Sequence, residues 1–339
     1  MKKKILQSYI SVRKPPKNLN ESDIELFSHE FEKKIQESHF LTVKNVYVLN
    51  TYLYKIFPLS FFFKYVYFYL PSVRKILKDI LRNFFKSKIN VNKKEIENAI
   101  WITDNKTAVY FHFLCDALGR YYLLPNSIKM KQIPIILPEK YNIDWIKEIL
   151  TYLNIDYLPT KKDNLYKVNN LLVPYYPAPS GNFHKENLSI LRNEFINNKN
   201  FTNKTQEPYK KVWVSRNKAR RQLSNFEEVS VFLKNEGFEI INFEDYSTES
   251  KLELMQKTKI IAGLHGSGLT NALFMQNKTF MLDVRDPKDN IKNAFFSLAS
   301  EVGVNYYYIE REDSKKYFIS IDKLKKVLNQ IYNDVDYEK

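Results

Sequence analysis

The strongest constraint on the fold is a regular alternation of apolar runs and amphipathic segments between residues 210 and 310. Short apolar runs of about four to eight residues are typical of strands buried on both faces, and the segments between them carry apolar residues at helical spacing. Strands that alternate with helices predict a mostly parallel sheet covered by helices on both faces. The apolar runs are KVWVS, FEIINF, KIIAGL, TFMLDV and VNYYYIE.

A similar alternation occupies residues 99–175, and a stretch rich in Pro, Gly and Asn follows at 174–182. A chain of 339 residues is longer than one ordinary hydrophobic core supports. We therefore predict an α/β fold with two Rossmann-like domains. The first covers residues 1–180, a linker region covers 181–208, and the second domain covers 209–339.

Three of the seven glycines lie within six positions of each other, in IIAGLHGSGLTN at 260–271. This stretch leads from a predicted strand into a predicted helix, where ligands bind in open parallel sheets. Glycines allow close approach of the backbone and positive φ angles, and unpaired N–H groups at a helix start attract anions. The stretch predicts a phosphate site. A tight turn without a ligand is the alternative, because the glycine order matches neither the Walker A nor the dinucleotide motif.

A basic loop, WVSRNKARRQL at 213–223, follows the first strand of the second domain. Its arginines lie at the same edge of the predicted sheet as the glycines, and guanidinium groups are good phosphate ligands. A solvated charged surface is the alternative interpretation. Together the two stretches predict a diphosphate site. Its residues are Arg216, Arg220, Arg221, His265, Gly266, Ser267, Gly268, Leu269, Thr270 and Asn271.

The charge balance favours anionic partners, because 53 Lys and Arg residues face 38 Asp and Glu residues and the net charge is +15. Nucleic acid, acidic lipid and phosphorylated small molecules all fit this charge. The single cysteine, Cys115, excludes an internal disulfide framework and fits a reducing compartment. Neither a signal peptide nor a membrane-spanning helix is predicted, so we expect a cytoplasmic protein.

Residues 52–88 combine a block of aromatic residues with a basic amphipathic helix. Such a helix can lie in the interface of an acidic membrane. It can equally pack its apolar face on the protein's own core. Both interpretations stay open, and the first would place the protein on the inner face of the cytoplasmic membrane.

Three stretches resemble motifs of glycosyltransferase family 61, which includes plant xylan xylosyltransferases, animal O-linked GlcNAc transferases and bacterial polysaccharide enzymes. They are YFHFLCDALGR at 110–120, SRNKARR at 215–221 and HGSGLTN at 265–271. Ser267 replaces a common alanine and Gly119 a common proline, while Ser250-Lys251 replaces Glu-Gln and puts donor contacts there in doubt. The bacterial branch of the family is the expected one.

The resemblance implies a GT-B architecture, with two Rossmann-like domains facing across a cleft. It also implies inversion at the anomeric carbon without a metal or other cofactor. Asp283 falls where the family often has an acidic residue, and the implied role is a contact with the ribose of the nucleotide. The Asp-x-Asp at 334–336 lies in a charged C-terminal stretch and is not expected to bind a metal.

Asp116 and His112 are the candidate catalytic residues, because a spacing of four places both side chains on one face of a predicted helix. Either can remove the proton from the acceptor hydroxyl, with Asp116 favoured, and a purely structural pair is the alternative. We predict an inverting glycosyltransferase that uses a nucleotide diphosphate sugar, a UDP-sugar first of all. Its expected acceptor is a glycan or lipid-linked glycan of a capsule or lipopolysaccharide. A basic nucleic-acid-binding protein and an inactive scaffold are the other hypotheses.

Overall fold

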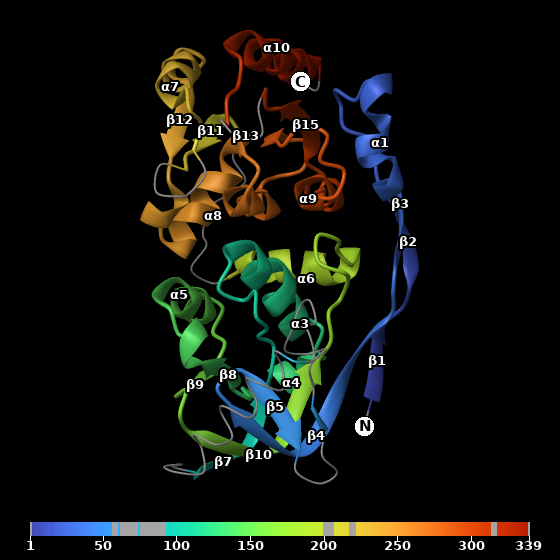
Figure 1. Cartoon of the computed structure of the whole chain (residues 1–339), viewed down its shortest axis with the longest axis vertical. Helices are drawn as coiled ribbons and strands as arrows, with labels where there is room; N and C mark the ends of the chain where they lie inside the picture. The colour runs from blue at the N-terminus through green and yellow to red at the C-terminus, as the bar shows by residue number, and fades with distance from the viewer. Residues whose placement is uncertain are drawn as a thin grey trace. The chain divides into compact units, whose positions relative to one another are not determined.

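The chain divides into two compact units in a computed structural model (Figure 1). Unit 1 contains residues 1–9 and 36–180, and unit 2 contains residues 10–35 and 181–339. Residues 10–35 therefore belong to the second unit, although the sequence analysis assigns them to the first domain. The predicted linker also contains a helix of unit 2, α6 (Lys185–Ile196). The structure describes residues 2–55, 60–61, 74, 93–198, 207–216, 222–312 and 317–337.

Unit 2 contains the five-stranded parallel sheet predicted from the alternation. Its strands are β11 (Lys210–Val214), β12 (Phe238–Ile241), β13 (Thr258–Leu264), β14 (Phe280–Arg285) and β15 (Asn305–Glu310). They lie in the order β12-β11-β13-β14-β15, and every neighbouring pair is parallel. The chain winds in one direction from β11 to β12 and in the other from β13 onward. The topological switch point, where such sheets bind ligands, therefore lies between β11 and β13.

Two helices cover one face of this sheet, namely α7 (Phe226–Asn235) and α10 (Ile321–Tyr337). The core on this face includes Trp213, Ala262 and Leu282 from successive strands. Side chains alternate along a strand, so residues one position away, such as Asp283, face the opposite side. The other described helical elements of the sheet region include the 3₁₀ helix η6 (Phe243–Asp245), α8 (Thr248–Gln256), the 3₁₀ helix η7 (Ser267–Phe274) and α9 (Ala294–Val302). The sequence analysis did not predict α10 and described these residues only as a charged C-terminal stretch.

The segment 10–35 covers the open edge of the sheet at β15. The backbone N–H of Lys17 donates to the Tyr306 carbonyl at 2.9 Å. The Asn18 side chain donates to the carbonyl of Tyr308 at 2.7 Å and accepts from its N–H at 3.1 Å. Figure 1 shows this segment, with α1 (Ile24–Phe27), beside β15. Pairing these backbone groups removes an exposed sheet edge, which is otherwise a template for aggregation.

Unit 1 contains a mixed sheet, which differs from the mostly parallel sheet predicted for it. The order is β6-β5-β4-β10-β7-β8-β9, with β1 also paired to β4. Strands from β10 to β9 are parallel, whereas the pairs that involve β1, β4, β5 and β6 are antiparallel. The long strand β4 makes this difference, because it precedes the alternation at 99–175 and pairs antiparallel with β10. The strands are β1 (Lys2–Leu6), β4 (Ser38–Leu49), β5 (Tyr52–Lys55), β6 (Ser60–Phe61), β7 (Lys93–Ile100), β8 (Ile135–Pro138), β9 (Tyr157–Thr160) and β10 (Leu165–Pro174).

The described helices of unit 1 are short and follow the parallel strands. They include the π-helix η4 (His112–Ala117), α3 (Leu118–Tyr122), α4 (Asn126–Lys129), the 3₁₀ helix η5 (Glu139–Tyr141) and α5 (Asp144–Tyr152). A separate two-stranded ribbon pairs β2 (Tyr9–Val12) with β3 (Glu32–Ile35). The predicted amphipathic helix within 52–88 lies almost wholly outside the described residues. Within the described part of the chain, no helix has the length and apolar character needed to cross a membrane.

Candidate functional site

Two predicted anion-binding residues of unit 2 meet at the topological switch point. Arg216 follows the end of β11, and His265 follows the end of β13, whose residue Gly263 pairs with Val214. The Arg216 guanidinium donates a hydrogen bond from Nη1 to the His265 carbonyl at 2.8 Å. The described start of the basic loop, at Arg216, therefore lies at the same edge of the sheet as the glycine stretch. Arg220 and Arg221 lie outside the described residues.

The glycines are required because β11 and its Arg216 pass directly against them. A Cβ on Gly266 would lie 2.2 Å from Nη1 of Arg216, and a Cβ on Gly268 would lie 2.5 Å from Cγ1 of Val214. A Cβ on Gly263 would lie 3.1 Å from the Val214 side chain. All three separations are shorter than ordinary contacts of a Cβ atom. Close approach therefore explains the cluster, and positive φ does not, since Gly266 has an extended φ of 167°.

The helix after the glycines is a 3₁₀ helix, and this limits the N–H groups that a ligand can reach. Its first bond runs from the N–H of Leu269 to the carbonyl of Gly266 at 2.9 Å. Only the N–H groups of Gly266, Ser267 and Gly268 precede that bond and lack a partner within the helix. The side chains of Leu269, Thr270 and Asn271 are fully buried. The sequence prediction is too broad here, because these three residues offer no surface to a ligand.

The His265 ring is held by a buried carboxylate. Its Nδ1 lies 2.8 Å from Oδ2 of Asp283, and the Tyr306 hydroxyl donates to the same oxygen at 2.9 Å. Asp283 has no exposed surface, whereas 16% of the His265 side chain is exposed. The predicted contact between Asp283 and a ribose does not fit this burial. Tyr306 was not predicted, because nothing in the local sequence links it to a histidine 41 positions earlier.

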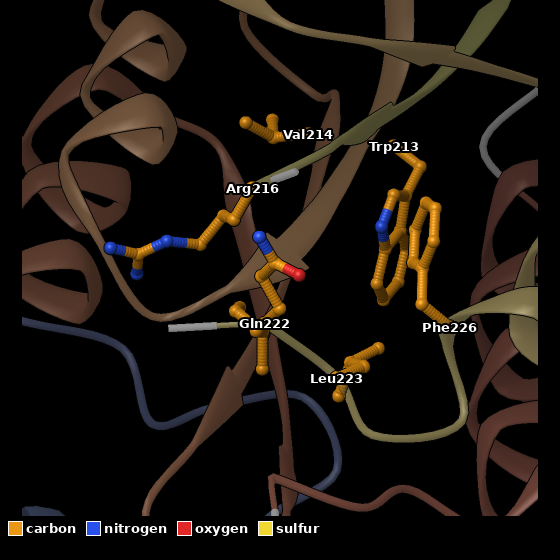
Figure 2. Close-up of a pocket in the computed structure, with 7 residues that line it drawn as sticks. Trp213, Val214, Arg216, Gln222, Leu223 and Phe226 are labelled. Atoms are coloured by element: carbon orange, nitrogen blue, oxygen red, sulfur yellow. The ribbon is translucent and has the colours of Figure 1, made fainter. Parts of the chain in front are cut away.

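Figure 2 shows a small pocket beside Arg216, at the end of β11. The rings of Trp213 and Phe226 form its apolar wall, and Arg216 extends away from them. Trp213 belongs to the hydrophobic core of unit 2, and Phe226 packs against that core. The remaining lining residues are Val214, Gln222, Leu223 and Leu264. The part of the pocket wall that faces the core is therefore apolar. Arg216 makes the part nearer to the glycine stretch cationic.

The two predicted catalytic residues of unit 1 are in direct contact. Nδ1 of His112 lies 2.6 Å from Oδ2 of Asp116. The predicted helix is a π-helix over this turn, a conformation that occurs often at functional sites. The His112 side chain is 20% exposed and that of Asp116 only 5%. His112 is therefore the member of the pair that solvent or a substrate can reach.

Ser180 is a third member of this cluster that sequence analysis missed. Its Oγ donates to Oδ2 of Asp116 at 2.9 Å. Burial raises the pKa of the Asp116 carboxyl, and the hydrogen bonds from His112 and Ser180 offset part of that increase. The stretch rich in Pro and Gly that contains Ser180 was the available signal. A serine nucleophile would need its hydroxyl on the base nitrogen of the histidine, so this arrangement is not that of a serine hydrolase.

Arg120 has a structural role in unit 1, although it follows the pair of His112 and Asp116 by one helical turn. The side chain is fully buried and donates to the carbonyls of Pro174 and Ile102 at 2.9 and 2.8 Å. Its guanidinium carbon lies 4.9 Å from the centre of the Tyr176 ring. The Tyr176 hydroxyl in turn donates to Asp104 at 2.5 Å. This network fixes the end of β10 against the residues that follow β7.

Carboxylates do not gather into a metal centre in the described part of the chain. No group of three or more His, Cys, Asp or Glu residues is placed to hold an ion there. Asp334, from the Asp-x-Asp at 334–336, lies in α10 and accepts a hydrogen bond from Tyr307 at 2.5 Å. That aspartate therefore has a structural partner.

A parallel sheet with a cationic, glycine-lined switch point defines an α/β protein whose sheet edge is suited to an anionic ligand. The family model described as Glycosyltransferase 61 matches residues 110–282, just over half of the chain, and the chain belongs to glycosyltransferase family 61. The chain is also similar to the EGF domain-specific O-linked N-acetylglucosamine transferase of Drosophila melanogaster, with 28% identity over 111 residues. That match covers 32% of this chain and 21% of the relative, so the chain spans about a fifth of the relative's length.

Proposed function

We propose that this enzyme transfers a sugar from a nucleoside diphosphate sugar to a hydroxyl of a glycan acceptor, with inversion and without a metal. The observation that carries the proposal is the cluster of Arg216, His265 and the first N–H groups of η7 at the switch point. These groups supply positive charge and hydrogen-bond donors at the position where parallel sheets bind phosphates. The diphosphate would bind there.

The departing diphosphate gains negative charge as its bond to the anomeric carbon breaks. Arg216 can donate two hydrogen bonds to phosphate oxygens, and the N–H groups of Ser267 and Gly268 can donate one each. Fixed donors of this kind stabilise charge that develops in the transition state. Removing one such donor typically lowers kcat by about 10²–10³. The cluster thus takes the place of the cation that metal-dependent transferases use.

The acceptor hydroxyl must lose a proton as its oxygen attacks the anomeric carbon. In neutral His112, Nδ1–H donates to Asp116, which leaves the lone pair on Nε2. Nε2 can therefore take the proton while Asp116 orients the ring. The greater exposure of His112 favours it over Asp116 as the base, a reversal of the preference from sequence. Asp116 would then be the positioning residue of the pair.

The wider proposal concerns the setting of the reaction. The family relationship supports a sugar donor and a hydroxyl acceptor, and UDP is the nucleotide we propose first. The acceptor would be a cell-surface glycan such as a capsule or lipopolysaccharide chain, modified on the cytoplasmic side. The Drosophila relative is named for an O-linked transfer, which also requires a hydroxyl acceptor. The GT-B arrangement of two Rossmann-like domains belongs to the same proposal.

The test is a screen of UDP-, GDP-, CDP- and dTDP-sugars for hydrolysis and binding in buffer that contains EDTA. We expect at least one to bind and to be hydrolysed slowly without a metal. Arg216→Ala should weaken binding of that donor about 10–100-fold, because a hydrogen bond to a charged group contributes about 1.5–3 kcal/mol. His112→Ala should keep donor binding and lose turnover.

Lys210→Ala is the matched control, since it removes one positive charge from the same strand. Lys210 pairs with Glu239 at 2.5 Å at the start of β11, away from the switch point. Its replacement should leave donor binding unchanged. Failure of all four nucleotide classes to bind in EDTA, with binding restored by Mg²⁺ or Mn²⁺, would contradict the metal-independent mechanism.

A further inference from the structure

Asp283 and Tyr306 form a second buried layer behind His265. Asp283 lies in β14 and Tyr306 in β15, and both are nearly or fully buried. The Asp283 Oδ2 atom accepts from both the His265 ring and the Tyr306 hydroxyl, at 2.8 and 2.9 Å. Burial raises the pKa of the Tyr306 hydroxyl well above its usual range, so the hydroxyl stays protonated and remains a donor. The carboxylate oxygen that contacts the histidine is thus also held by the tyrosine hydroxyl.

The backbone and the ring of His265 are held by separate contacts. Its N–H donates to the carbonyl of Val284 at 2.9 Å, and its carbonyl accepts from Arg216. The ring packs edge-on against Phe295, with 4.8 Å between ring centres. Those contacts do not fix the ring about χ2, whose preference in histidine is broad and roughly two-fold. A flip about this torsion would put Cδ2 in the place of Nδ1 and Cε1 in the place of Nε2. Among the contacts of the described residues, the one with Asp283 selects the orientation in which Nδ1 points inward.

We infer that Asp283, held by Tyr306, is a positioning residue that orients His265 so that Nε2 points toward the donor diphosphate. The inference rests on the proposed function, because it gives His265 a phosphate to contact. It assigns Asp283 an indirect role through the imidazole. Without the carboxylate, the ring would populate flipped orientations and lose part of its contact with the phosphate.

A double-mutant cycle separates this role from a merely structural one. The variants are His265→Ala, Asp283→Asn and the combination of both. The probe is whichever of UDP, GDP, CDP and dTDP the unmodified protein binds most tightly, and its affinity is measured by titration calorimetry in EDTA. We expect His265→Ala to weaken binding about 10–100-fold, as expected for a hydrogen bond to a charged phosphate. Asp283→Asn alone should weaken binding about tenfold, since partners behind a ligating histidine typically contribute 10–100-fold.

The decisive result concerns the His265→Ala background. If Asp283 acts through the ring, Asp283→Asn causes no further loss of affinity there, because contacts that share one partner are not additive. An equal loss in both backgrounds would overturn the inference and leave the proposed function intact. An unchanged affinity in His265→Ala itself would instead contradict the proposed function. The two failures are therefore distinguishable.

Two further variants guard against a general loss of folding. Tyr306→Phe removes one donor to the carboxylate without emptying the core, and it should weaken binding about threefold in the presence of His265 and not in its absence. Asp286→Asn is the control, because Asp286 directly follows β14 but pairs with Arg311 rather than with His265. The Asp286→Asn variant should leave the affinity for the nucleoside diphosphate unchanged. If Asp283→Asn does not fold, the cycle built with Tyr306→Phe decides the question, and additivity in that cycle overturns the inference.

Discussion

Gly266→Ala should weaken donor binding while the protein stays folded. The new Cβ would lie 2.2 Å from Nη1 of Arg216, so the guanidinium must retreat by at least about 1 Å to reach an ordinary contact distance. That movement breaks its 2.8 Å hydrogen bond to the His265 carbonyl. The atom that moves is the far end of a flexible side chain that is partly exposed. The cost in unfolding free energy should therefore be small, about 0.5–1.5 kcal/mol.

The effect on affinity should be larger than the effect on stability. A displaced Arg216 no longer donates to the phosphate, which should weaken binding about 10–100-fold. Urea denaturation gives the stability change, and calorimetric titration with the nucleoside diphosphate gives the affinity. Gly237→Ala provides the opposite control: Gly237 has a φ of 80° and no atom near its Cβ position, so its replacement should cost about 1–2 kcal/mol of stability and no affinity. Normal donor affinity in Gly266→Ala would refute the assignment of Arg216 to the diphosphate.

Three other predictions concern unit 1 and the edge of the sheet in unit 2. Because burial raises the pKa of Asp116, the native protein retains a proton that the unfolded chain releases, and native stability falls as pH rises from about 4 through the native pKa. The Asp116→Asn variant should therefore have a higher urea denaturation midpoint than the unmodified protein, and the difference between the two midpoints should grow over this pH range. A difference that does not change with pH would argue against the raised pKa. Ser180→Ala should reduce kcat with little change in donor KM, because it removes a 2.9 Å contact to Asp116 and none to the donor cluster; an effect on KM alone would contradict that role. Asn18→Ala should lower the unfolding free energy by about 1–3 kcal/mol through loss of both hydrogen bonds to Tyr308, measured by urea denaturation, and an unchanged midpoint would exclude edge capping as a source of stability.

The parallel sheet of unit 2 could be predicted because its strands are short apolar runs with clear helical segments between them. The same pattern correctly located the ends of β11 and β13, and hence the contact between Arg216 and His265. Residues at strand ends are brought together by the sheet itself, so neighbouring motifs suffice to predict such a contact. The pair of His112 and Asp116 was predictable for a similar reason, since a spacing of four is local.

Other features depended on contacts that no local pattern encodes. The segment 10–35 covers the edge of β15, which lies nearly 300 residues later in the chain. The resemblance implied a ribose contact for Asp283, but strand alternation turns this residue toward a buried tyrosine of the next strand. The 3₁₀ geometry of η7 was also hidden, because its sequence is compatible with an ordinary helix start. The burial of Asp283 and the 3₁₀ geometry of η7 decide which of the predicted residues of unit 2 a ligand can reach.

The most direct test is a crystal structure of the protein with its donor diphosphate, prepared in EDTA. We predict phosphate oxygens within hydrogen-bond distance, about 2.7–3.2 Å, of the Arg216 guanidinium and of the N–H groups of Ser267 and Gly268. Nε2 of His265 should face the same phosphate. A diphosphate bound elsewhere on the chain, or one joined to the protein through a divalent ion, would contradict the account.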